Sequence, residues 1–378
     1  KVTGSSPVPA TKTIKRLYYY SVTVFLFYEV ISWAHILQLP DSGKPETSGM
    51  MPPRTAKEVN PTYYRKPKQF TRAFLIYTYL STMKIHKSGF VNIVGLPNVG
   101  KSTLMNALLG EKLSIITKKA QTTRHRIHGI LSKEEYQIVF SDTPGFIEKP
   151  AYKMQEEMNK YVKSTFDDAD IFLYLTELGA SLEKQADLYT PISKGDTPVL
   201  LLINKIDTAK NEEEIKEYAE LWKAVFPKAE VLFISALEKF NLEAIIATIV
   251  AGLPEGPVYF DKDQISDKNE RFFVTEIIRG KLLELYKQEI PYSCQVEIDE
   301  FIEEDHIDKI RATIYTERDT QKSIIIGKGG IAIKKLGTLA RKDIEIFLGK
   351  KVYLELFVKV KEGWRDNDLM LKHFGYKE

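Results

Sequence analysis

The sequence predicts an α/β fold: a domain with a mostly parallel sheet and helices on both faces, followed by a smaller α+β domain. Between residues 90 and 254, short aliphatic and β-branched runs alternate with amphipathic helical patterns. This alternation is typical of parallel strands that are buried on both faces. A glycine-rich loop follows the first run, at residue 95. Beyond residue 270 the order becomes helix, two strands, two helices and a strand, which indicates a separate α+β domain.

Strands are expected at residues 90–94, 136–140, 171–175, 199–203 and 231–234, with a further strand-like stretch over 125–131. The carboxyl ends of parallel strands meet at one edge of a sheet, and ligands bind such folds at that edge. Polar motifs follow several of these strands. We therefore expect a single binding site assembled from segments that are far apart in the sequence.

The first motif matches G-x-x-x-x-G-K-[ST], the loop that cradles phosphates in nucleoside triphosphatases. Its two glycines allow a tight turn in which successive N–H groups point at phosphate oxygens. A helical pattern follows and Gly110 is expected to end it, so the phosphates would lie at a helix N-terminus. The predicted nucleotide contacts are Gly95, Leu96, Pro97, Asn98, Val99, Gly100, Lys101, Ser102 and Thr103.

The charged and hydroxyl residues of this loop suit a metal-bound triphosphate. The Lys101 ammonium can contact the β- and γ-phosphates, and the Ser102 hydroxyl is a hard oxygen ligand for Mg²⁺. About twenty residues later, Thr122 and Thr123 lie in a loop that can reach the same metal ion. Asp142, at the end of a strand, is expected beside the metal ion, and the Gly145 N–H can bond the γ-phosphate. Thr143, Pro144 and Phe146 complete this predicted motif.

A fourth motif predicts which base is bound. Asn204, Lys205, Ile206 and Asp207 follow the run 199–203. The Asp207 carboxylate can accept hydrogen bonds from guanine N1 and N2, whereas adenine would leave it unpaired. After the last strand, Ser235 and Ala236 can present a backbone N–H to guanine O6. The sequence therefore predicts a guanine nucleotide site.

These motifs resemble those of the Era family of ribosome-assembly GTPases. The resemblance is carried by Gly-Leu-Pro-Asn-Val-Gly-Lys-Ser-Thr-Leu-Met-Asn from residue 95, Lys-Lys-Ala-Gln-Thr-Thr-Arg-His-Arg-Ile over 118–127, and Phe-Ser-Asp-Thr-Pro-Gly over 140–145. It covers residues 86–378. It implies GTP and GDP as ligands and Mg²⁺ held by Ser102, Thr123 and Asp142, with Thr123 preferred over Thr122. Lys101, Thr123 and Gly145 are the expected catalytic groups.

One position predicts slow hydrolysis. Ras-like enzymes carry a glutamine after Asp-x-x-Gly to orient the attacking water, whereas this chain has Phe146. Arg124 and Arg126 are available nearby to supply charge, but we expect them to be exposed to solvent or to face RNA. In similar GTPases an asparagine equivalent to Asn98 helps to hold a potassium ion. We therefore hypothesise hydrolysis stimulated by K⁺.

The second domain has the element order of a type II KH domain. A Gly-Lys-Gly-Gly turn at residue 327 lies between two helices, and such a turn lets the backbone approach about four nucleotides of a single strand. Residues 328–361 hold nine Lys/Arg and three acidic residues, whereas 299–308 hold six acidic residues. One face can therefore bind phosphates although the domain is nearly neutral. The predicted RNA contacts are Gly327, Lys328, Gly329, Gly330, Lys334, Lys335, Arg341 and Lys342.

Residues 1–82 match nothing in this pattern. They carry 11 Lys/Arg and 4 Asp/Glu, and the apolar stretch 17–39 is about long enough to span a bilayer. Glu29 and His35 within it argue against that interpretation. A membrane anchor, a removed targeting segment and an artefactual upstream extension remain as alternatives. We favour the extension, with translation starting near Met83.

The predicted organisation is an unmatched N-terminal extension at residues 1–82, a GTPase domain at 83–252, a linker at 253–269 and a KH domain at 270–378. One cysteine, Cys294, excludes a disulfide framework and suits a reducing compartment. The resemblance implies a cytoplasmic monomer that binds the 3′ end of small-subunit (16S) ribosomal RNA and assists assembly of the 30S subunit. Similar proteins associate peripherally with the inner face of the cell membrane. The alternative is a membrane-tethered signalling GTPase whose C-terminal domain binds proteins.

Overall fold

The computed structural model describes residues 86–117, 119 and 121–377, which belong to a single unit of the chain. The stretch 17–39 and the proposed start at Met83 lie outside the described residues. In the part of the chain that the structure describes, no helix combines the length and the apolar character needed to cross a bilayer.

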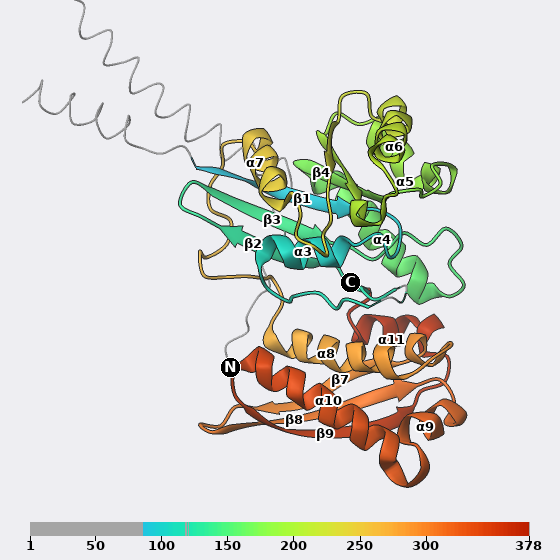
Figure 1. Cartoon of the computed structure of the whole chain (residues 1–378). Helices are drawn as coiled ribbons and strands as arrows, with labels where there is room; N and C mark the ends of the chain where they lie inside the picture. Colours follow the sequence, from blue (N-terminus) through green and yellow to red (C-terminus); the bar gives the residue numbers. More distant parts are fainter. Residues whose placement is uncertain (1–85, 118, 120, 378) are drawn as a thin grey trace, which may run out of the picture. The chain divides into compact units, whose positions relative to one another are not determined.

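A six-stranded sheet forms the first domain (Figure 1), in the order β2-β3-β1-β4-β5-β6. Its strands are β1 (Lys87–Val94), β2 (Ile127–Ser132), β3 (Tyr136–Asp142), β4 (Ile171–Glu177), β5 (Val199–Asn204) and β6 (Glu230–Phe233). Five of them run parallel, and the edge strand β2 pairs antiparallel with β3. The prediction of a mostly parallel sheet is confirmed. Strand β2 begins later than the expected residue 125.

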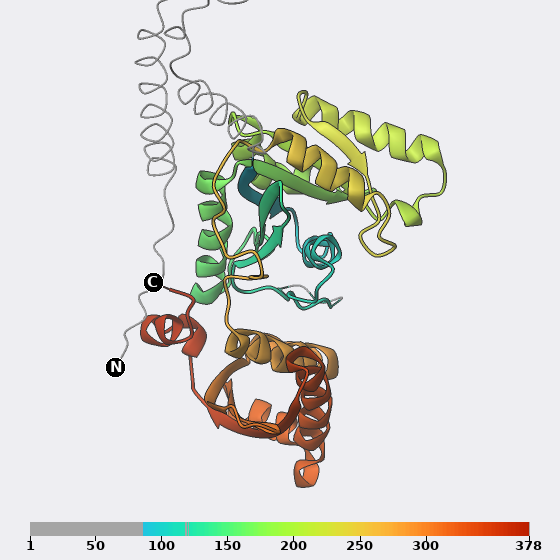
Figure 2. The ribbon, with the colours of Figure 1, turned by 90° about the vertical axis from the view of Figure 1, so that its left-hand side faces the viewer.

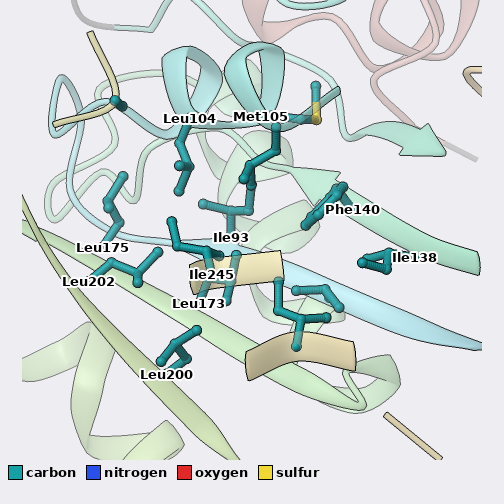
Figure 3. Close-up of a cluster of buried hydrophobic side chains, with 14 of the residues drawn as sticks. Ile93, Leu104, Met105, Ile138, Phe140, Leu173, Leu175, Leu200, Leu202 and Ile245 are labelled. Atoms are coloured by element: carbon teal, nitrogen blue, oxygen red, sulfur yellow. The ribbon is translucent and has the colours of Figure 1, made fainter. Parts of the chain in front are cut away.

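Helices cover both faces of this sheet, and each face has its own apolar core. The helices are α3 (Lys101–Leu109), α4 (Lys153–Asp168), α5 (Ala186–Ser193), α6 (Glu212–Val225) and α7 (Leu242–Gly252). Side chains of α3 and α7 pack on one face, as Figure 3 shows for Leu104, Met105 and Ile245 against strand residues such as Ile93 and Leu173. Side chains of α4, α5 and α6 pack on the other face. This burial fixes the strand ends from which the polar motifs project.

The second domain has the predicted order, with helices packed on one face of a three-stranded sheet (Figure 2). Its elements are α8 (Glu270–Leu285), β7 (Gln295–Ile302), β8 (Ile307–Thr316), α9 (Asp319–Ile326), α10 (Ile331–Leu348) and β9 (Lys351–Val360). Strand β8 is central, antiparallel to β7 and parallel to β9. The glycine-rich turn lies between α9 and α10, where it was expected.

A short C-terminal helix, α11 (Asp368–His373), was not predicted. The Asn367 side chain caps it by accepting from Leu369 N and Met370 N. Together with Trp364 and Tyr376 it packs against α4 of the first domain (Figures 1 and 2). Six residues are too few to show a helical period, so the Asn367 cap was the available sequence signal.

Candidate functional site

The phosphate loop connects β1 to α3, and two of its glycines are required by close neighbours. A Cβ atom on Gly95 would lie 2.3 Å from the Leu175 carbonyl oxygen, and one on Gly100 would lie 2.4 Å from Asn204 Nδ2. Gly100 also has a φ of 105°, a left-handed conformation that favours glycine. The helix then runs to Leu109 and ends at Gly110, as predicted.

Lys101 is buried inside this loop. Its Nζ donates to the carbonyl oxygens of Gly95 at 3.0 Å and Leu96 at 2.9 Å. Burial lowers the pKa of the ammonium to about 8, and the neighbouring Asp142 partly opposes this shift. Phosphate oxygens that replaced the two carbonyls would favour the charged form. The lysine is therefore already held where the predicted phosphates would bind.

The three predicted metal ligands converge. Ser102 Oγ donates to Asp142 Oδ2 at 2.7 Å and lies 2.9 Å from Thr123 Oγ1, which is 3.2 Å from the same carboxylate oxygen. Burial raises the pKa of Asp142, while the Ser102 hydrogen bond and the Lys101 charge oppose the increase. The second carboxylate oxygen, Oδ1, is buried without a hydrogen-bond partner in the described part of the chain. Two hydroxyl oxygens beside a carboxylate that has one unsatisfied oxygen are ligands of the kind that Mg²⁺ prefers, so these residues fit the predicted metal ion.

Thr122 does not join this set. Its Oγ1 donates to the Lys119 carbonyl at 2.7 Å and lies 2.9 Å from Thr117 Oγ1. Adjacent residues of an extended segment point to opposite sides, so only one of the two threonines can face the metal ligands. The structure places Thr123 there.

Segments from three of the four motifs line one pocket. Gly145 lies against the phosphate loop so closely that a Cβ atom on it would be 2.7–2.9 Å from Pro97 atoms. Thr143 is anchored by its Oγ1, which donates to the Ile93 carbonyl at 3.2 Å. The pocket is lined by Pro97, Asn98, Gly100, Lys101, Ser102, Thr103, Ile115, Ile116, Thr117, Gln121, Thr122, Thr123, Thr143 and Gly145. Phe146 does not line it and instead packs against the apolar core beside α4, α5 and α6.

The fourth motif is tied to the phosphate loop through Asn204. Its Nδ2 donates to the Val99 carbonyl at 2.8 Å, and its Oδ1 accepts from Ala236 N at 2.9 Å. Asp207 is exposed at the same edge of the sheet and has no hydrogen-bond partner among the described residues. The Ala236 N–H is already used, so a donor to guanine O6 would come from another backbone group of that segment. Lys205 has a positive φ of 61° and pairs with Glu177.

The expectation that Arg124 and Arg126 are exposed to solvent or face RNA is wrong. Arg124 is fully buried and donates to backbone carbonyls of the second domain. Arg126 is 13% exposed; its Nη1 and Nη2 lie 2.7 and 3.0 Å from the Asp168 carboxylate oxygens, and its Nε donates to Ser141 Oγ at 2.6 Å. Their partners lie 15 to 252 residues away, and local sequence patterns do not reveal such contacts.

A second candidate site surrounds the glycine-rich turn. Gly327, Gly329 and Gly330 have φ values of 72°, 60° and 76°, which non-glycine residues rarely adopt. Lys328 is exposed at the tip of the turn. The predicted basic side chains on α10, Lys334, Lys335, Arg341 and Lys342, are exposed as well. Among the residues that the structure describes, none of these five basic groups pairs with a carboxylate.

A groove runs beside this turn, between α10 and β9. Its lining is Ile333, Lys334, Gly337, Thr338, Arg341, Leu354 and Leu356. Lys334 and Arg341 line it because they are seven residues apart and share one helix face, whereas Lys335 and Lys342 do not line it. The sequence analysis did not predict the apolar residues of the lining. The available signals were Gly337, a glycine inside a helix that lets a neighbouring strand approach closely, and the apolar alternation of β9. An apolar floor with basic edges suits a single nucleic-acid strand.

Comparisons with known proteins match both domains of the chain. A sequence family described as 50S ribosome-binding GTPase matches residues 90–205, and the KH domain family matches residues 289–365. A crystal structure of Era in complex with MgGDPNP and nucleotides 1506–1542 of 16S ribosomal RNA is 38% identical, with a TM-score of 0.73 over 78% of this chain and 100% of that one. A variant of Aquifex aeolicus Era bound to GDP and AlF4⁻ is also 38% identical, with a TM-score of 0.73 over 77% of this chain and 100% of that one.

The fold and the two sites define a P-loop GTPase that is followed by a KH domain. Within that class, the chain belongs to the Era family of GTPases.

Proposed function

We propose that this protein is a GTP-controlled RNA-binding protein that binds the 3′ end of 16S ribosomal RNA and acts in assembly of the small ribosomal subunit. The observation that carries the proposal is the basic-edged groove beside an exposed glycine-rich turn, in a chain that aligns over 78% of its length with Era solved on that RNA. The 3′ end would bind as a single strand, because the bases of an A-form duplex are poorly accessible to side chains.

In this proposal the first domain binds GTP through the residues named above. Lys101 exchanges its two carbonyl partners for phosphate oxygens, Asp207 accepts from guanine, and Asn204 connects the phosphate and base subsites. Ser102, Thr123 and Asp142 would hold Mg²⁺, which neutralises charge on the β- and γ-phosphates. Phe146 packs in an apolar core and cannot hydrogen-bond an attacking water, so intrinsic hydrolysis is slow.

We place the GTPase domain at 83–252, a linker at 253–269 and the KH domain at 270–378. The change of pattern between α7 and α8 supports these boundaries. We propose a cytoplasmic protein that associates peripherally with the membrane; the single cysteine, Cys294, is buried and unpaired, which suits a reducing compartment.

The nucleotide is expected to change RNA affinity. We expect the affinity of the full chain for a single-stranded RNA with the 16S 3′-terminal sequence to differ by about tenfold or more between the GDPNP-bound and GDP-bound states. A smaller difference in affinity would shift a two-state equilibrium little. Fluorescence anisotropy with labelled RNA at fixed salt concentration measures the two affinities, and the complementary RNA serves as the control. Equal affinities in the two nucleotide states would rule out the coupling.

Hydrolysis is expected to be several-fold faster in K⁺ than in Na⁺. Asn98 has a positive φ of 66° and lines the phosphate pocket, which leaves its side-chain oxygen available to a monovalent cation that supplies charge in place of the missing glutamine. Phosphate release is compared in KCl and NaCl at equal ionic strength for the wild type and Asn98→Ala. The variant should lose the difference between the two salts. Equal wild-type rates would contradict the K⁺ hypothesis.

A further inference from the structure

The segment that carries Thr123, residues 121–126, contacts two different parts of the protein. It has no helix or strand of its own, since β2 begins at Ile127. Thr123 points toward Ser102 and Asp142 in the first domain. The groups on either side of it bind the KH domain instead. A segment without regular structure depends on such contacts for its geometry, because its backbone groups have no ladder partners.

Arg124 makes the most extensive of these contacts. Its Nη1 donates to the Cys294 carbonyl at 2.8 Å, and its Nη2 donates to the carbonyls of Tyr292 at 3.0 Å and Pro291 at 3.2 Å. Its side chain is fully buried. A buried guanidinium is costly unless it is hydrogen-bonded, and charge-assisted bonds to carbonyls offset that cost. The fork of the guanidinium allows one side chain to reach all three carbonyls, which a lysine ammonium cannot do with the same geometry.

These carbonyls have donors from two different domains. Between residues 291 and 294, the carbonyls of three residues accept from Arg124, and the remaining one, that of Ser293, accepts from Trp364 Nε1 at 3.0 Å. Trp364 belongs to the KH domain, whereas Arg124 comes from the GTPase domain. One residue of the GTPase domain, Arg124, thus accounts for three of the four carbonyl contacts, and Arg311 on β8, which pairs with Glu300 and Glu355, provides an arginine control inside the KH domain.

The neighbours of Arg124 are held in the same way. The Thr122 carbonyl accepts from Arg279, which forms a buried ion pair with Glu276 on α8. The His125 ring stacks on Tyr376 with ring centroids 4.5 Å apart. The KH domain thus holds Thr123 from both sides along the chain.

We propose that Arg124 is a positioning residue for GTP hydrolysis. Anchored in the carbonyls of Pro291, Tyr292 and Cys294, it holds Thr123 beside the Mg²⁺ ligands, so that the KH domain completes the metal site of the GTPase domain. The inference rests on the proposed function, in which Thr123 is a Mg²⁺ ligand. It makes the KH domain a structural requirement for hydrolysis as well as an RNA-binding module.

The test measures the Mg²⁺ concentration that gives half-maximal GTP hydrolysis, together with kcat and the Kd for GDP, on the full chain. For Arg124→Gln we expect the half-maximal Mg²⁺ concentration to rise about tenfold and kcat to fall about tenfold, as is typical when the support of a metal ligand is removed. The GDP Kd should change less than about twofold, because the phosphate loop and Asp207 are untouched. Arg311→Gln, which removes an exposed arginine of β8 from its ion pairs with Glu300 and Glu355, should leave both kinetic values unchanged. Equal changes in both variants would overturn the proposal.

A double-mutant cycle separates this inference from the proposed function. Thr123→Ala alone should raise the Mg²⁺ requirement, and adding Arg124→Gln should raise it no further, because the arginine acts through the threonine. Additive effects would show that Arg124 acts elsewhere and would overturn the inference. An unchanged Mg²⁺ requirement in Thr123→Ala would instead disprove the proposed ligand. If Arg124→Gln fails to fold, Arg124→Lys replaces it under the same criteria.

Discussion

Asp207→Asn is expected to lower GTP affinity by about 100-fold and to create affinity for xanthosine triphosphate. The carboxylate accepts from the N1–H and 2-amino groups of guanine, and an amide presents an NH₂ group to that amino group instead. Xanthine carries a carbonyl at this position, which the amide can donate to. Asp207 is exposed and has no intramolecular hydrogen bond among the described residues, so the substitution should not alter the free energy of unfolding. Competition against labelled GDP with GTP and xanthosine triphosphate measures both affinities.

Asp196→Asn provides the matched control. Asp196 is exposed just before β5, at the opposite end of the strand that leads to Asp207. Asp196→Asn changes the net charge by the same amount as Asp207→Asn, but at the edge of the sheet opposite the predicted base site. We expect it to bind GTP like the wild type. If Asp207→Asn retained wild-type GTP affinity, the assignment of residues 204–207 to the base would be incorrect.

Gly329→Asp is expected to weaken binding of the 16S 3′-terminal RNA by about 30-fold or more and to leave GTP affinity unchanged. The substitution adds a negative charge at the tip of the turn, where phosphates would approach the backbone. No protein atom lies within 4 Å of a Cβ atom placed there, so the side chain does not clash with the domain. Its φ of 60° imposes a modest strain of about 1 kcal/mol. Anisotropy titrations at constant salt give the change.

The chain contains a close control for that strain and charge. Gly349 ends α10, is exposed, has a φ of 65° and also has no atom within 4 Å of a built Cβ. Gly349→Asp should therefore lower the melting temperature as much as Gly329→Asp does while retaining RNA affinity. Equal loss of RNA binding in the two variants would point to a general electrostatic effect and would argue against a clamp at residues 327–330.

Sequence patterns were sufficient where the chemistry is local. The phosphate loop follows β1, Asp142 and Asn204 end β3 and β5, and parallel strands bring such ends together. The preference for Thr123 over Thr122 came from family resemblance, and the structure places Thr123 beside Ser102. The KH element order was predictable because an apolar alternation in β9 and a helical period in α10 are both long enough to recognise.

Contacts between distant segments could not be predicted in this way. Arg124 binds backbone carbonyls, and every residue carries a carbonyl, so no side-chain pattern identifies its partners. Arg126 binds Asp168, the last residue of α4, which lies 42 residues further along the chain. The apolar lining of the α10–β9 groove depends on how a helix and a strand pack, which their separate periods do not specify.

The long sequence separation of the Arg124 contact has a consequence for synthesis of the protein. The carbonyls that hold this arginine follow it by 167 to 170 residues. At about 5 to 20 residues per second, a translating ribosome needs roughly 10 to 30 seconds to make that stretch. During this interval the nascent chain already contains the phosphate loop but lacks the anchor that holds Thr123. A newly made GTPase domain would therefore bind nucleotide before it hydrolyses it, which postpones turnover until the KH domain has emerged and folded.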